Sequence, residues 1–121
     1  MYLVRETVLG EVAFGVQGDR GRARAALARF GLSDFEERHP RDLSSGQRER
    51  LGLAAVAVVE PGVLVLDEPT RGMDPERRRE LVDWLHETAS AGTAVLVVTH
   101  DQSFPGHRRL RLTSEHGLRR V

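Results

Sequence analysis

The chain has 121 residues, 40% of them hydrophobic and 30% charged, which suits one globular domain with a core rather than two domains. Its 18 basic and 18 acidic side chains cancel, so no overall field favours nucleic acid or an anionic membrane surface as a partner. The absence of cysteine excludes disulfides and thiolate metal sites.

Neither a membrane span nor a secretory signal is predicted in these residues. The longest apolar run, Leu53–Val59, is far shorter than the roughly 20 residues that cross a bilayer as a helix. Met1–Gly10 carries Arg5 and Glu6 and has no sustained apolar core. We therefore expect a cytoplasmic chain that reaches a membrane only through a partner.

All 18 basic residues are arginine. Codon bias in a GC-rich genome is a sufficient explanation. The chemical consequence holds whatever the cause, because no motif that requires a lysine can be present in these 121 residues.

The first third of the sequence predicts one amphipathic helix. Thr7–Val16 alternates weakly, which is typical of a loop or a short extended segment, and Gly18–Gly21 is typical of a turn. Four apolar residues then follow at helical spacing: Ala23, Ala26, Leu27 and Phe30. Gly31 is expected to end this helix, because glycine accepts the left-handed conformation at a helix end.

A second helix is predicted over Ser45–Val59, before the break at Glu60–Gly62. Its first turns are polar and its later turns apolar, so it should start exposed and end buried. The residues Leu43–Gln47 read LSSGQ. Small residues with free N–H groups at a helix N-terminus suit a phosphate. The alternative is a plain cap in which Ser44 or Ser45 is the N-cap residue.

Two continuous apolar runs, Val63–Leu66 and Ala94–Val98, predict strands that are covered on both faces. Between them, Asp74 and Pro75 are typical of a helix start, and Gly92 of a helix end. The buried side of that helix should carry Leu81, Trp84, Leu85 and Thr88. Strand, helix and strand in this order predict a parallel βαβ unit and an α/β fold.

A closing β-hairpin is predicted at the end of the sequence. Its strands would be Arg109–Leu112 and Leu118–Val121, and its turn Glu115–Gly117.

Reactive side chains follow both predicted parallel strands. Asp67 and Glu68 end the first strand, and Thr99, His100 and Asp101 end the second. Ligands of open parallel sheets bind beyond these carboxyl ends. Asp67 is a candidate for Mg²⁺, and Glu68 for polarising an attacking water. The alternatives are two solvated acids and a surface histidine.

The segment Leu43–Asp101 resembles the nucleotide-binding domain of ABC ATPases, motif by motif. LSSGQ resembles the signature, with Ser45 where glycine is commoner. VLVLDEP resembles the Walker B element of P-loop ATPases, TRGMDP the D-loop, and His100 the switch histidine. Upstream, TVLGEVAFGV and the pair His39–Pro40 are similar to the energy-coupling-factor branch, which serves vitamin and metal importers.

The resemblance implies an α/β fold with a partial P-loop ATPase core over residues 60–121, preceded by part of a helical signature subdomain over residues 1–59. The implied cofactors are ATP and Mg²⁺. Glu68 and His100 would be catalytic, and Asp67 would hold the metal. The implied nucleotide contacts are Ser44, Ser45, Gly46, Gln47 and Asp74.

The resemblance also implies partners. A second ABC ATPase domain would pair head to tail with this one, and membrane-embedded transporter subunits would hold both at the inner face of the cell membrane, where ATP hydrolysis drives solute transport. Nucleic acid is not an expected partner.

The family's P-loop, GxxxxGK[ST], requires a lysine that this chain does not contain. We therefore expect the C-terminal portion of such a domain, inactive alone, with a poorly covered sheet. Two alternatives remain: a non-catalytic partner that donates the signature motif in trans, and a non-transport ABC ATPase of DNA repair or translation.

Overall fold

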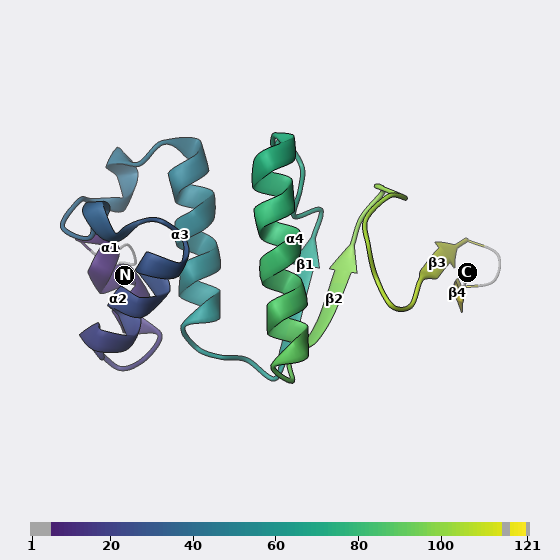
Figure 1. Ribbon diagram of the computed structural model, residues 1–121, viewed down its shortest axis with the longest axis horizontal. Coiled ribbons are helices and arrows are strands. Elements are labelled where there is room, and N and C mark those ends of the chain that lie inside the picture. Colours follow the sequence, from purple (N-terminus) through teal and green to yellow (C-terminus); the bar gives the residue numbers. More distant parts are fainter. Residues whose placement is uncertain (1–5, 115–116, 121) are drawn as a thin grey trace. The chain divides into compact units, whose positions relative to one another are not determined.

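The computed structural model describes residues 6–114 and 117–120, with side chains up to residue 114 (Figure 1). The chain divides into two compact units, Met1–Gly62 and Val63–Val121. From residue 6 on, the first unit contains three helices: α1 (Val8–Phe14), α2 (Arg20–Arg29) and α3 (Ser45–Ala57). It also holds two 3-10 turns, Ser33–Phe35 and Pro40–Asp42. The second unit holds α4 (Pro75–Ser90) and four strands: β1 (Val63–Asp67), β2 (Ala94–Val98), β3 (Leu110–Thr113) and β4 (Gly117–Arg120).

Helix α1 corrects the expectation of a loop or extended segment over Thr7–Val16. Thr7 is the N-cap residue, and its hydroxyl accepts a hydrogen bond from the Gly10 N–H at 2.9 Å. The four buried residues of α1 occur at helical spacing: Val8, Leu9, Val12 and Ala13. The helical period is only two turns long, so it is not distinguishable from weak alternation in the sequence. The segment is helical because a helix buries these four side chains together.

Helix α2 forms where the apolar stripe predicted it. Ala23 and Leu27 are fully buried, and Ala26 and Phe30 pack against the same core. Gly31 has φ +71 and ends the helix, as predicted. The core of this unit joins all three helices: Val8, Leu9, Val12, Ala13, Ala23, Leu27, Leu32, Leu43, Leu51, Ala54 and Val58.

Helix α3 ends at Ala57, two residues before the predicted end. One side of its later turns is buried, with Leu51, Ala54 and Val58 in the core, whereas Val56 remains 40% exposed. Glu60 then takes a left-handed φ of 52, which breaks the chain direction before Pro61 and Gly62.

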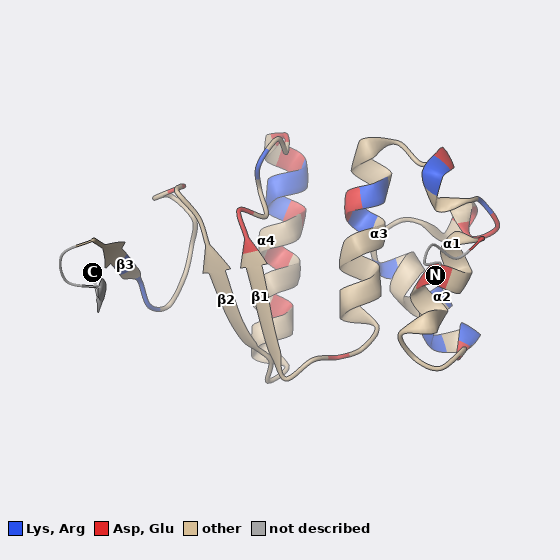
Figure 2. Cartoon of the chain, turned by 180° about the vertical axis from the view of Figure 1, so that it is seen from behind, with Lys and Arg blue, Asp and Glu red and all other residues tan. Residues whose placement is uncertain are grey.

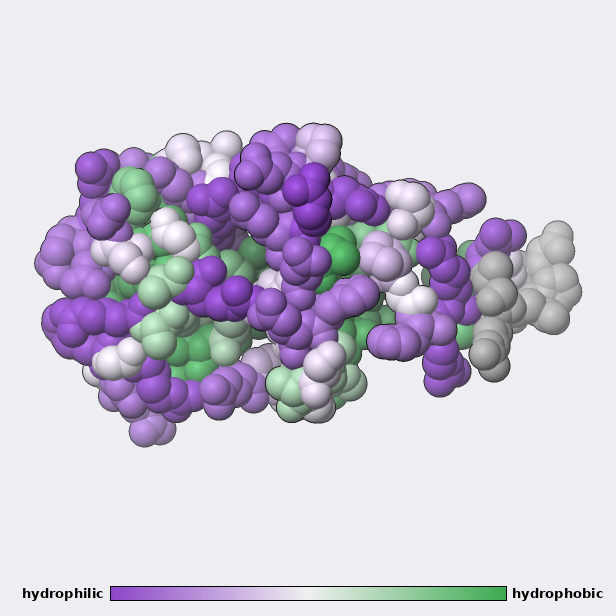
Figure 3. Space-filling model, viewed as in Figure 1, coloured by the Kyte–Doolittle hydropathy of each residue, from purple (hydrophilic) through white to green (hydrophobic). Residues whose placement is uncertain are grey.

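The predicted parallel βαβ unit is present in the second unit. Strands β1 and β2 pair in parallel from Val63 opposite Ala94 to Asp67 opposite Val98. Asp74 caps α4 by accepting from the Arg77 N–H at 2.9 Å. The predicted inner face of α4 is confirmed, since Leu81, Trp84 and Leu85 are buried. Thr88 is half-buried and donates to the Trp84 carbonyl. The outward side of α4 is mainly hydrophilic (Figure 3).

The expectation that both faces of the two strands are covered is wrong. Helix α4 lies on one face only (Figures 1 and 2), so side chains of the other face are open. Val63 is 64% exposed, Val65 58%, and Leu96 and Val98 51% each. An unbroken apolar run shows that a strand is suited to burial on both faces, but it does not show that another element packs on each face. The expectation of a poorly covered sheet is confirmed.

The closing hairpin is confirmed as an antiparallel pair of β3 and β4, with Leu110 opposite Arg120 and Thr113 opposite Gly117. Residues 115 and 116 of the predicted turn, and Val121, lie outside the described residues. In the part of the chain that the structure describes, no helix has the length and apolar character needed to cross a bilayer.

Candidate functional site

In the first unit, the LSSGQ segment forms the start of α3. Ser44 is the N-cap residue, and its hydroxyl accepts from the Gln47 N–H at 3.2 Å. The Gln47 side-chain oxygen in turn accepts a hydrogen bond from the Ser44 N–H at 2.9 Å, which completes a capping box. Ser45 and Gly46 form the first turn, where helix N–H groups carry partial positive charge. The segment is thus fixed as a helix start, and Ser44 and Ser45 are exposed.

Replacing Ser44 with alanine should lower the free energy of unfolding by about 1 kcal/mol, because the cap acceptor is lost. Urea unfolding followed by far-UV circular dichroism measures this change. Ser45→Ala is the matched control, since Ser45 is not the cap residue, and it should change stability by less than about 0.5 kcal/mol. Equal effects of the two substitutions would contradict the assigned cap.

In the second unit, the predicted carboxylates lie at the carboxyl end of β1 (red in Figure 2). Asp67 is the last residue of the strand and is exposed, whereas the Glu68 side chain is only 19% exposed. Glu68 has φ 47, a left-handed conformation that is strained for a residue other than glycine. Its N–H donates to the Val98 carbonyl at 2.7 Å, which ties this turn to the end of β2.

The structure brings Glu68 and His100 together. The His100 N–H donates to Glu68 Oε1 at 2.8 Å, and His100 Nε2 lies 3.7 Å from the same oxygen. The Thr99 hydroxyl donates to Glu68 Oε2 at 3.2 Å. The His100 side chain is 98% exposed, so one of its faces is open to a ligand. A carboxylate and an imidazole at neighbouring strand tips can together orient a water and accept its proton.

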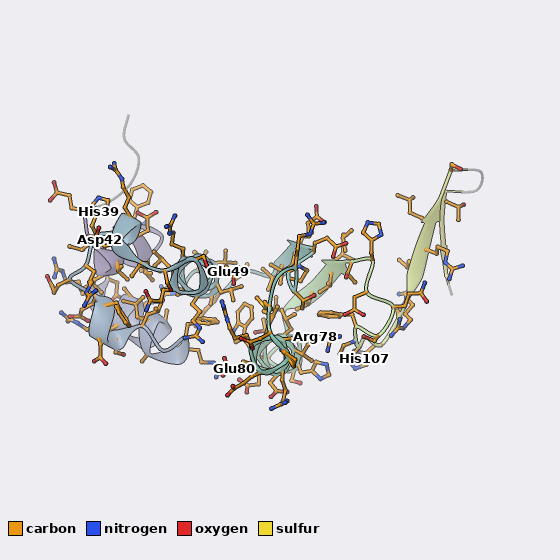
Figure 4. The ribbon with its side chains drawn as sticks, turned by 90° about the horizontal axis from the view of Figure 1, so that it is seen from above. His39, Asp42, Glu49, Arg78, Glu80 and His107 are labelled. Atoms are coloured by element: carbon orange, nitrogen blue, oxygen red, sulfur yellow. The ribbon has the colours of Figure 1, made fainter. Side chains whose placement is uncertain are left out.

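The segment after His100 is anchored on α4. Arg78 donates to Asp101 Oδ2 at 2.9 Å, and its guanidinium lies 5.7 Å from the centre of the Phe104 ring (Figure 4). Ser103 donates to Asp101 Oδ1 through its hydroxyl at 2.6 Å and its N–H at 2.9 Å. These Ser103 hydrogen bonds, together with Arg78, hold the pKa of Asp101 below its usual range.

The remaining predicted site residues are Asp67 for the metal and Asp74 for the nucleotide. Among the described residues, no group of three His, Asp or Glu side chains could hold a metal ion. A single exposed carboxylate still fits Mg²⁺, which keeps several waters and takes further ligands from phosphates. Asp74 is exposed and caps α4, so part of its carboxylate is used within the chain.

The sequence patterns predict no specific role for Thr99 or Arg78. Thr99 stands directly before His100, so its position could have drawn attention to it. Arg78 could not be found this way, because its contact with Asp101 joins residues 23 positions apart and depends on how α4 packs.

Comparisons with known proteins identify the family and the fold. Residues 16–104 match the family described as "AAA domain, putative AbiEii toxin, Type IV TA system". The energy-coupling factor transporter ATP-binding protein EcfA2 of Streptococcus thermophilus is 40% identical over 81% of this chain and 38% of its own length. CbiO1 of Clostridium perfringens, part of the ABC transporter complex CbiONQ, is 33% identical with a TM-score of 0.69, over 84% of this chain and 44% of that one.

A structure titled "An inward-facing conformation of a putative metal-chelate type ABC transporter" has a TM-score of 0.81 at 22% identity, over 100% of this chain and 53% of that one. The fold is therefore that of the P-loop ATPases. The chain belongs to this AAA-type class and, within it, to the ATP-binding proteins of ABC transporters. It spans 25% to 39% of the length of the curated relatives that it matches.

Proposed function

We propose that this chain supplies signature and Walker B elements for ATP sites in an ABC transporter, and that ATP hydrolysis at such sites drives solute transport. The observation that carries the proposal is the contact of Glu68 with His100 at adjacent strand tips. A partner that only donates a signature motif has no use for this pair, so the pair favours a catalytic site over a purely structural module.

In the proposed site, Glu68 accepts the proton of the attacking water, and its orientation is set by the donors around its carboxylate. His100, with its exposed imidazole, contacts the terminal phosphate and the same water. Asp67 would hold Mg²⁺ through water, and the bound ion would neutralise charge on the phosphate oxygens.

The start of α3 has the complementary task. Ser44, Ser45 and Gly46, with Gln47 behind them, present a helix N-terminus to the phosphate of ATP held by the P-loop of a second domain. Asp74 would contact that second domain. Since EcfA2 and CbiO1 carry transporter names, we propose the energy-coupling-factor branch, at the cytoplasmic side of a membrane and bound to membrane-embedded subunits.

Mg-ATP should give no saturable heat in a calorimetric titration of the 121-residue chain, because without a lysine it contains no GxxxxGK[ST] loop. When the chain is immobilised, EcfA2 of Streptococcus thermophilus should be retained in the presence of ATP and not of ADP. EcfA2 serves here as the partner that brings a P-loop. Clear micromolar binding of ATP by the chain alone would contradict the proposal.

Gly46→Asp tests the signature in this association, since it places a carboxylate where the phosphate is expected, and Gly52→Asp is its matched control. Gly46→Asp should abolish the ATP-dependent retention, whereas Gly52→Asp, further along the same helix, should not. Apart from its chain neighbours and the backbone of its own helix, no heavy atom lies within 4 Å of the position that a Cβ on Gly52 would take, so the control substitution meets no steric barrier. Retention that is indifferent to both substitutions would count against the signature assignment.

A further inference from the structure

The Glu68 carboxylate is held at both oxygens. Oε1 accepts from the His100 N–H, and Oε2 accepts from the Thr99 hydroxyl. Two donors on two oxygens fix both the position and the plane of a carboxylate. The first donor belongs to the backbone, so no side-chain change removes it directly. The second donor is the Thr99 side-chain hydroxyl, and the groups that orient this hydroxyl determine how firmly the carboxylate is held.

The direction of the Thr99 hydroxyl proton is itself determined. The Asp101 N–H donates to Thr99 Oγ1 at 2.9 Å. A hydroxyl has a single proton to donate, and with this N–H on one lone pair the proton is left to point at Glu68. Thr99 is also β-branched, which restricts its χ1 angle. The residue therefore presents its donor to Glu68 in one preferred orientation.

The Asp101 carboxylate accepts a hydrogen bond from Arg78 on α4 and a second from the Ser103 N–H. Phe104, which is 8% exposed, packs under the Arg78 guanidinium, and Arg109 donates to the carbonyls of Gln102 and Phe104 at 2.6 Å each. A continuous set of hydrogen bonds thus leads from α4 through Asp101 and Thr99 to the Glu68 carboxylate. All of these residues lie in the second unit.

We propose that Thr99 is a positioning residue for Glu68, which its hydroxyl holds in the orientation needed to accept a proton, with Arg78 and Asp101 as the anchor of that hydroxyl on α4. The proposal rests on the proposed function for the role of Glu68. The effect of Thr99 on catalysis passes through the carboxylate that it orients, and the strained φ of Glu68 makes such support necessary.

The test compares Thr99→Val, which keeps the shape and removes the hydroxyl, with Thr99→Ser, which keeps the hydroxyl. NMR of the labelled 121-residue chain measures the coupling through the hydrogen bond between the His100 nitrogen and the Glu68 carboxyl carbon. We expect this coupling in the unsubstituted chain and in Thr99→Ser, and its loss in Thr99→Val. The Asp101 amide should also exchange about five- to tenfold faster in Thr99→Val, because its acceptor is gone.

Persistence of the coupling in Thr99→Val would overturn the proposal, as would its loss in Thr99→Ser. The amide signals of α4, which belongs to the same unit as Thr99, report whether the variant is folded. If Thr99→Val does not fold, Thr99→Ala, which removes the γ-methyl group together with the hydroxyl, gives the same comparison. No nucleotide is present in this experiment, so failure of the ATP-dependent association described above would count against the proposed function and leave the hydrogen-bond result standing.

Discussion

Replacing Glu68 with glutamine should lower ATP turnover about 100- to 10,000-fold in an assembly that places a P-loop beside the carboxyl end of β1, while the KM for ATP changes little. A side chain that accepts a proton in the transition state contributes this order of rate enhancement. Steady-state phosphate release at saturating Mg-ATP measures the effect. The loss should fall on kcat, because the substitution removes an interaction made in the transition state.

Glutamine also disturbs the resting geometry of the site. Both Glu68 oxygens accept hydrogen bonds, from the His100 N–H and the Thr99 hydroxyl. An amide has one oxygen and one NH₂ group, so one of these donors must face another donor. The His100 N–H belongs to the backbone and cannot reorient, so the Thr99 hydroxyl must rotate its proton away from the amide NH₂ group. The variant therefore loses the proposed base and also weakens the hydrogen bonds that hold its side chain.

Glu60→Gln is the matched control for this prediction. Glu60 is also a glutamate with a left-handed φ, 52 against 47 for Glu68, and its side chain is 83% exposed. Its ion pair with Arg22 has an N–O distance of 3.9 Å, so its loss should cost little. Turnover should be unchanged in Glu60→Gln. Full turnover in Glu68→Gln would show that Glu68 is not the proton acceptor.

Much of the site could be predicted from the sequence because its residues stand at the ends of strongly patterned elements. An apolar run that stops at Asp67 and Glu68, and another that stops before Thr99 and His100, fix the tips of two parallel strands. Strand tips meet at one edge of a sheet, so the pairing of Glu68 with His100 follows from topology. The cap of α3 by Ser44 follows from local chemistry in the same way.

Other features depend on packing and could not be predicted. Helix α1 is too short for its period to stand out, and it forms because Val8, Leu9 and Val12 reach a shared core. The open face at Val65 and Leu96 depends on what covers the sheet, which no strand pattern records. The left-handed turn at Glu68 is held by contacts with the end of β2, so no property of the isolated residue predicts it.

Replacing Leu27 with alanine should lower the free energy of unfolding of the first unit by about 2–5 kcal/mol. Leu27 is fully buried in a cluster to which α1, α2 and α3 all contribute. The substitution removes a buried isobutyl group and leaves a cavity that three short helices cannot close completely. The total free energy of unfolding of a small domain is about 5–15 kcal/mol, so this one substitution would remove a large part of it.

The measurement is urea unfolding followed by far-UV circular dichroism, which detects the helices of both units, with NMR amide signals of α1 to α3 to separate the first unit from α4. Leu112→Ala is the matched control, because it deletes the same group from a position that is 77% exposed, and its effect should stay below about 0.5 kcal/mol. Since the start of α3 belongs to the same unit as Leu27, loosening this core should also weaken the ATP-dependent association with EcfA2. A Leu27→Ala chain as stable as the Leu112→Ala chain would show that the three helices do not share one core.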